Sequence, residues 1–157
     1  MDAIRLLERQ HAEMRTLLRE VEAAPESERS VELEILVDAI ERHRMLEERH
    51  LYPALDAVGL AGLHRCREHH RLLGHSARHL AELKATDRPV ASALKVLAAQ
   101  LERHICDDEQ HLFPVAKRAL DGDERVRLGH EMAETIAEAE NELWIGSPTA
   151  WTNHSHA

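Results

Sequence analysis

Apolar residues recur every three or four positions along four stretches of the sequence, at residues 2–23, 30–53, 63–85 and 89–114. This spacing puts them on one face of a helix and predicts four amphipathic helices, each with an apolar stripe to bury. Segments containing Gly, Pro, Ser or Asp separate the stretches, so consecutive helices are expected to run antiparallel. A weaker stripe predicts a further helix over residues 121–143. The pattern therefore predicts an all-α fold: an up-down-up-down four-helix bundle with an additional C-terminal fifth helix.

One motif occurs twice, on the second and the fourth predicted helix. It begins at His43 and again, 61 residues later, at His104. Both copies read His, three residues, two carboxylates, two residues, Leu, an aromatic residue and Pro. Because residues four apart share one face of a helix, His43 with Glu47 and His104 with Asp108 each form a nitrogen-and-oxygen pair. The proline of each copy is expected to kink or interrupt its helix, since it lacks an N–H and its ring clashes with the preceding turn.

Both pairs lie on the stripes that their helices should bury. Apolar residues precede each pair at steps of three and four, with Ile40 before His43 and Leu101 before His104. Ionised carboxylates are rarely buried without a partner, because their desolvation is costly. A bound metal ion would compensate this cost, so the two pairs are candidate metal ligands.

The first and third predicted helices also carry histidine on their stripes. His11 lies in the middle of the first stripe. On the third helix the series through Leu73 and Leu80 extends backwards to His69, which predicts that His69 rather than His70 faces inward. All four stripes then carry metal-ligand residue types near their middle. Pseudo-twofold symmetry between the two halves of the chain would place two metals side by side.

The sequence from His11 to Pro114 resembles the hemerythrin-like proteins of the HHE cation-binding family. The HxxxEExxLYP run at His43 and the HxxxDExxLFP run at His104 carry the resemblance. It implies a non-haem di-iron centre inside a four-helix bundle, with two Fe ions bridged by two carboxylates and an oxo or hydroxo group. The metal ligands implied by the resemblance are His11, His43, Glu47, His69, His104 and Asp108.

The sequence departs from the oxygen-carrying hemerythrins at two places. Their third helix supplies an HxxxH pair, but Leu73 stands four residues after His69. Their last carboxylate ligand lies five residues after its histidine, at Glu109 here, whereas the shorter spacing of many relatives selects Asp108. Asp108 continues the stripe and is preferred, with Glu109 as the alternative. The missing histidine leaves one further exchangeable metal position, and the candidates to fill it are water, Tyr52, His50 and His111.

An extra exchangeable position favours a site that binds or reacts with dioxygen, hydrogen peroxide or nitric oxide, in defence against oxidative or nitrosative stress. Whether this is enzymatic turnover, of a catalase-like, peroxidase-like or nitric-oxide-reactive kind, stays open, as does oxygen or iron sensing or storage without turnover.

Two other classes of protein stay open. Glu47-x-x-His50 and Asp108-x-x-His111 match a motif of ferritin-like di-iron proteins. A metal-free helical interaction module would instead pair the same histidines and carboxylates with one another.

Charge and hydropathy limit the partners of the protein. The 157 residues carry a net charge of −9 with His counted neutral, which argues against nucleic acid or an anionic membrane as a main partner. No apolar run approaches the ~20 residues of a membrane span, and the N-terminus has the pattern of an amphipathic helix rather than a signal peptide. These features predict a cytoplasmic protein. The candidate metal site predicts a small molecule (O2, H2O2 or NO) as the partner, and we expect a monomer or a weak homo-oligomer.

The length of the chain suits one domain. We expect the bundle over residues 1–143, with the metal site within 11–108, and a loosely ordered tail over 144–157. Two cysteines, Cys66 and Cys106, are too few for a disulfide scaffold and are expected to be reduced structural thiols. Of the 13 histidines, those on polar faces are expected to be solvated, among them His75, His79 and His130.

Overall fold

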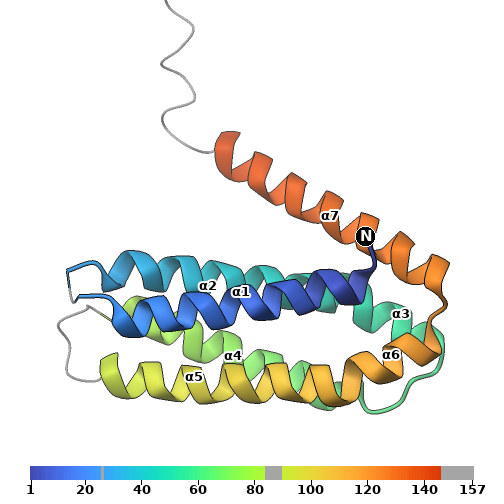
Figure 1. Ribbon diagram of the computed structural model, residues 1–157, viewed down its shortest axis with the longest axis horizontal. Helices are drawn as coiled ribbons and strands as arrows, with labels where there is room; N and C mark the ends of the chain where they lie inside the picture. Colours follow the sequence, from blue (N-terminus) through green and yellow to red (C-terminus); the bar gives the residue numbers. More distant parts are fainter. Residues whose placement is uncertain (26, 84–89, 146–157) are drawn as a thin grey trace, which may run out of the picture.

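A computed structural model describes residues 1–25, 27–83 and 90–145 of the chain, and it confirms the predicted all-α bundle (Figure 1). Four long helices lie side by side and alternate in direction along the chain. They are α1 (Ala3–Ala23), α2 (Arg29–Leu46), α4 (Leu63–Glu82) and α5 (Val90–Asp107). Asp2 caps α1, because its side chain accepts hydrogen bonds from the backbone N–H groups of Ile4 and Arg5.

The two helices that carry the repeated motif continue through a π-helical turn. Segment η1 (Glu47–Leu51) joins α2 to the short helix α3 (Tyr52–Ala57), and η2 (Asp108–Leu112) joins α5 to α6 (Phe113–Ala119). The prolines are the cause, since neither can donate the hydrogen bond that a regular helix requires. Tyr52 N–H donates instead to the Glu47 carbonyl, five residues back, and Phe113 N–H to that of Asp108. Each predicted helix interruption is thus a local widening of the helix at the candidate ligands. Such π-turns within α-helices are frequent at functional sites.

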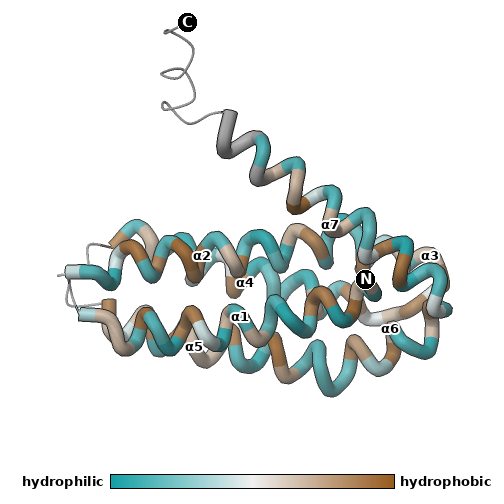
Figure 2. Tube along the Cα trace, turned by 45° about the horizontal axis from the view of Figure 1, so that its top comes forward, coloured by the Kyte–Doolittle hydropathy of each residue, from teal (hydrophilic) through white to brown (hydrophobic). Residues whose placement is uncertain are grey.

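Two apolar clusters fill the bundle, one on each side of a buried polar layer. The first contains Leu7 and Leu46, and the second contains Met14 and Ile40. His11 lies between Leu7 and Met14 along α1, and the motif of α2 begins in the same interval between Ile40 and Leu46. Figure 2 shows the hydrophobic residues recurring along each helix, interrupted by hydrophilic ones. The fold therefore holds its buried polar side chains in one layer across the middle of the bundle.

The predicted fifth helix is α7 (Gly122–Ile145), which packs on α1 by its first half and then diverges from the bundle (Figure 1). Leu128 and Met132 are buried in the first apolar cluster. A Cβ atom at Gly129 would overlap the Met1 carbonyl oxygen, so only glycine allows this close approach. Most of the predicted tail, residues 146–157, lies outside the described residues. Within the described part of the chain, no helix combines the length and the apolar character needed to cross a membrane.

Candidate metal centre

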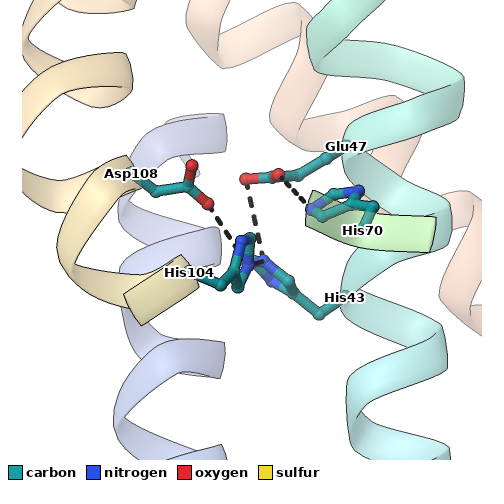
Figure 3. A group of neighbouring side chains, drawn as sticks. All are labelled: His43, Glu47, His70, His104 and Asp108. Atoms are coloured by element: carbon teal, nitrogen blue, oxygen red, sulfur yellow. Dashed lines mark hydrogen bonds and ion pairs between the residues drawn. The ribbon is translucent and has the colours of Figure 1, made fainter. Parts of the chain in front are cut away.

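The polar layer brings together side chains of metal-ligand types from three of the four long helices and from the two π-turns (Figure 3). Each of five side chains offers one nitrogen or oxygen atom, and these atoms all lie within 4.8 Å of one another. All five residues are buried. They are His43, Glu47, His70, His104 and Asp108.

His11 completes the layer from the fourth long helix, α1. Its side chain is fully buried, with Nε2 3.2 Å from His43 Nε2 and 3.8 Å from Asp108 Oδ2. His43 Nε2 also lies 3.0 Å from His104 Nε2. The Nε2 atoms of three histidines therefore converge beside the two carboxylates, and the fourth, that of His70, lies 3.1 Å from Glu47 Oε2.

The prediction that His69 faces inward is wrong, and His70 takes that place. His70 is fully buried, whereas the His69 side chain is 25% exposed and lies 3.5 Å from Asp107 on the surface. The buried face of α4 includes Gly74 and Ala77, which lie on the same side of the helix as His70. These small residues let α4 approach α2 closely, and a side chain at Gly74 would overlap the Arg44 guanidinium. Gly74 lies four positions after His70, and Ala77 lies three positions before Leu80. These two small residues were therefore the sequence signal that could have identified His70 as the inward histidine.

The structure separates the two adjacent carboxylates of the second motif. Asp108 is 2% exposed and its Oδ2 lies 3.3 Å from His104 Nε2. The Glu109 side chain is 34% exposed and lies outside the layer, where it contacts the outer nitrogen of His11. Asp108 is thus the carboxylate that a metal in the layer would meet.

Of the three side chains considered for a further metal position, Tyr52 alone reaches the layer. Its Oη donates a hydrogen bond to Glu47 Oε2 at 2.8 Å and lies 3.1 Å from His70 Nε2. His50 instead lies 2.9 Å from the Thr135 hydroxyl on α7, and His111 is exposed. A π-turn contains more residues per turn than an α-helix, so it rotates the side chains that follow it away from the original stripe.

The orientation of these histidines also excludes a ferritin-like site. Such a site needs both Glu-x-x-His pairs to converge, as well as inward carboxylates on the other two helices. Here the histidines of both pairs point away from the layer, while α1 and α4 supply His11 and His70. The histidines on polar faces, His75, His79 and His130, are exposed as predicted.

Burial decides the protonation of most imidazoles in the layer. It lowers the pKa of His43 to about 3 and also lowers the pKa values of His11 and His104. Burial opposes protonation of His70 too, but hydrogen bonds to Glu47 and Glu48 outweigh it and raise the pKa of this histidine. Three of the four imidazoles are therefore neutral near pH 7, and neutral imidazole is the form that binds metals.

The two buried carboxylates differ in their affinity for protons. Burial opposes ionisation of Glu47, but the adjacent His43 and His70 outweigh it and hold the pKa of Glu47 below its ordinary value. Burial raises the pKa of Asp108 well above its ordinary value, and the negative charge of Glu47 raises it further. A positive charge beside Asp108 would favour ionisation of both carboxylates together.

The layer fits a metal centre by its unsatisfied atoms as well as by its donor types. Glu47 Oε1 and Asp108 Oδ2 are buried and accept no hydrogen bond from the described residues. Such atoms are rare in folded proteins, because each carries the full cost of desolvation. Cations that ligate imidazole nitrogen and carboxylate oxygen would satisfy both oxygens and the converging Nε2 atoms.

A cavity of about 340 Å³ reaches one side of the layer between the first turns of α4, the residues that precede them, the end of α5 and the segments η2 and α6 that follow α5. His104 and Asp108 form part of its wall, and Arg65, Arg103 and His111 are among its other residues. Cys66 also lines it, half-buried, and burial together with the charges of Asp108 and Glu47 raises the pKa of its thiol to about 11. Cys66 is thus a neutral thiol beside a route to the layer, and Cys106 is likewise half-buried and free.

An all-helical bundle with a buried layer of histidine and carboxylate ligands defines a class of metal-binding proteins. The family model of the hemerythrin HHE cation binding domain matches residues 2–116. The chain therefore belongs to the hemerythrin HHE cation binding domain family.

The fold is similar to that of a solved relative. The crystal structure of a hemerythrin HHE cation binding domain-containing protein from Mycobacterium kansasii matches with a TM-score of 0.80 and 20% sequence identity. The match covers 90% of this chain and 89% of that chain. No curated protein matches the sequence. The family and the buried cluster together suggest metal binding.

Replacing His70 should weaken metal binding, whereas replacing its neighbour should not. His70→Ala removes a buried imidazole from the candidate site, so metal affinity should fall by more than about tenfold. In His69→Ala the layer is untouched and affinity should stay within about twofold of the parent. Competition with a chelator, followed by titration of each metal-free variant, measures both. Loss of binding in His69→Ala with retention in His70→Ala would contradict the orientation of α4.

The metal-free protein should lose stability as the pH falls below about 6.5. His11, His43 and His104 have folded-state pKa values below 6.5, so the unfolded chain binds protons there that the folded chain does not. Asp108 opposes this with one proton, because its raised pKa keeps it protonated when folded. His70 is protonated in both states in this range. The unfolded chain therefore binds more protons than the folded chain. This difference lowers the free energy of unfolding by roughly 1–3 kcal/mol for each pH unit of acidification near pH 5.5.

Urea unfolding of chelator-treated protein at pH 7.5 and pH 5.5 measures this slope. His75→Gln is the matched control, since His75 is exposed and its replacement should leave the slope unchanged. A free energy of unfolding that stays constant or rises on acidification would contradict the burial of neutral histidines in the layer.

Proposed function

We propose that the protein binds two iron ions in the polar layer and uses them to bind or react with a small oxidant. The candidate oxidants are dioxygen, hydrogen peroxide and nitric oxide, and the proposed role is defence against oxidative or nitrosative stress. The observation that carries the proposal is the grouping of six buried ligand side chains from four helices. The proposed ligands are His11, His43, Glu47, His70, His104 and Asp108.

The arrangement of the six residues supports two metals rather than one. Glu47 has His43 and His70 beside it, at 3.7 and 3.1 Å. Asp108 has His104 and His11 beside it, at 3.3 and 3.8 Å. Each group contains one carboxylate, the histidine four residues before it and a histidine from another helix. This equivalence matches the pseudo-twofold repeat of the motif in the sequence.

The donor set supports iron. Imidazole nitrogen and carboxylate oxygen suit iron, manganese and zinc, whereas thiolate or thioether sulfur would favour copper(I). Iron in particular is proposed from the hemerythrin family membership. Six side chains would hold two iron ions without filling all of their coordination positions, which would leave room for a small molecule. Bound iron would supply the redox chemistry, by changing oxidation state when the oxidant binds.

The remaining residues of the layer would position ligands and control access. Tyr52 holds Glu47 through its hydroxyl, and burial, together with the charges of Glu47 and Asp108, raises the pKa of this phenol far above its ordinary value. Tyr52 therefore stays protonated and presents a hydrogen-bond donor at the edge of the layer. The cavity beside Cys66 offers the route for a small molecule to His104 and Asp108. At about 340 Å³ it is at the lower end of ligand-pocket volumes.

Protein purified without added metal should contain about two iron atoms per chain and absorb visible light through ligand-to-iron charge transfer. His43→Ala should lose both, because it removes a ligand at the centre of the layer. His79→Ala is the matched control, since His79 is exposed, and it should keep both. Elemental analysis and absorption spectroscopy measure these properties. A parent protein without stoichiometric metal, and with a melting temperature unaffected by chelation, would overturn the proposal.

Addition of each oxidant to the iron-loaded protein then separates turnover from binding. Catalase-like turnover would release oxygen from hydrogen peroxide, and a binding protein would give a stable, reversible spectral change with dioxygen or nitric oxide. Iron-loaded protein that responds to none of the three would retain the metal site and overturn the proposed reactivity.

A further inference from the structure

The second carboxylate of each motif copy lies outside the metal layer but contacts a histidine within it. Glu48 Oε1 lies 3.3 Å from His70 Nδ1, and Glu109 Oε1 lies 3.1 Å from His11 Nδ1. In both cases the contacted histidine belongs to a helix that carries no motif, α4 or α1. The contacted nitrogen is the one that points away from the centre of the layer, since Nε2 points inward.

Each of these carboxylates is held in turn by an arginine. Arg44 donates to Glu48 Oε1 at 3.2 Å, and Arg15 donates to Glu109 Oε1 at 3.3 Å. The Arg44 side chain is 13% exposed and fills the space above Gly74, where a Cβ atom would overlap it. The same sequence of contacts, arginine to glutamate to histidine, thus occurs on both sides of the layer.

A carboxylate fixes which imidazole nitrogen carries the proton. Because an ionised carboxylate only accepts hydrogen bonds, Nδ1 of each histidine must be the donor. Nδ1–H then leaves the lone pair of a neutral imidazole on Nε2, the nitrogen that faces the layer. A carboxylate partner also makes the imidazole a stronger ligand and holds its ring plane.

From these contacts we propose that Glu48 and Glu109 are positioning residues of the metal centre. They orient the imidazole rings of His70 and His11 so that Nε2 of each faces the layer, while Arg44 and Arg15 hold the two carboxylates in place. This inference rests on the proposed function, because it assigns the residues a role toward the bound metal. It also gives a reason for two adjacent carboxylates in each motif: the first is a ligand and the second orients a histidine from a neighbouring helix.

A simpler reading is that both glutamates merely form surface ion pairs with arginine. The structure provides a matched control for this reading on each side. Glu41 accepts from Arg44 at 2.7 Å, and Glu102 accepts from Arg15 at 3.1 Å. These two glutamates share the arginines but make none of the hydrogen bonds or ion pairs to the layer that Glu48 and Glu109 make. Exposed pairs of this kind contribute little to stability.

The test compares metal binding by four variants: Glu48→Gln, Glu109→Gln, Glu41→Gln and Glu102→Gln. Glutamine keeps the size of the side chain but can donate as well as accept, so it no longer fixes the tautomer. Co²⁺ is the probe, because its visible spectrum reports ligand geometry without iron redox chemistry. Affinity should fall about 10- to 100-fold in the first two variants, with altered Co²⁺ bands. The other two should bind like the parent and show its spectrum.

A second measurement needs no metal. In metal-free protein, ¹⁵N NMR of the imidazoles should show His11 with its proton on Nδ1 in the parent and in Glu102→Gln, and a mixture of tautomers in Glu109→Gln. Equal affinities and spectra in all four variants would overturn the positioning role while leaving the metal site intact. A parent protein that binds neither Co²⁺ nor iron would overturn the proposed function. The NMR measurement would then still test whether Glu109 orients His11, because it needs no metal.

Discussion

The structure depends on one constraint: two carboxylates and four imidazoles are buried in a single layer between two apolar clusters. Burial of this kind is costly without compensating charge. The protein meets part of the cost internally, through neutral imidazoles, the Tyr52 hydroxyl on Glu47 and a raised pKa on Asp108. The two buried oxygens without a hydrogen bond remain, one on each carboxylate. Cations held by these side chains would satisfy both oxygens and favour ionisation of both carboxylates, so the layer suits the binding of metal.

The π-turns arrange the layer in three dimensions. Each begins at the inward carboxylate and ends two residues before a proline, so the helix widens where the candidate ligands lie. Widening places Tyr52 against Glu47 and turns His50 and His111 outward. Phe113, the counterpart of Tyr52 in the second motif, lacks a hydroxyl and stacks on His11 instead. The two halves of the site are therefore alike in their candidate ligands and different in the aromatic side chain beside them.

Much of the architecture could be predicted because the apolar stripes are long and regular. The four-helix bundle, the fifth helix and the inward orientation of His11, His43 and His104 all follow from steps of three and four residues. The prediction failed on α4, where Gly74 and Ala77 carry the buried face and hydrophobicity alone points to His69. The contacts of Glu48 and Glu109 could not be predicted either, since they join residues from different helices, and periodicity describes one helix at a time.

Anomalous X-ray diffraction at the iron edge, from crystals of protein purified without added metal, tests the central claim most directly. Two anomalous peaks should lie in the polar layer, within bonding distance of Glu47 and Asp108. His70 Nε2 should be a ligand, and Glu48 and Glu109 should contact imidazole Nδ1 atoms rather than metal. A layer without anomalous peaks, or with metal bound by His69 or Glu109, would contradict this account of the site.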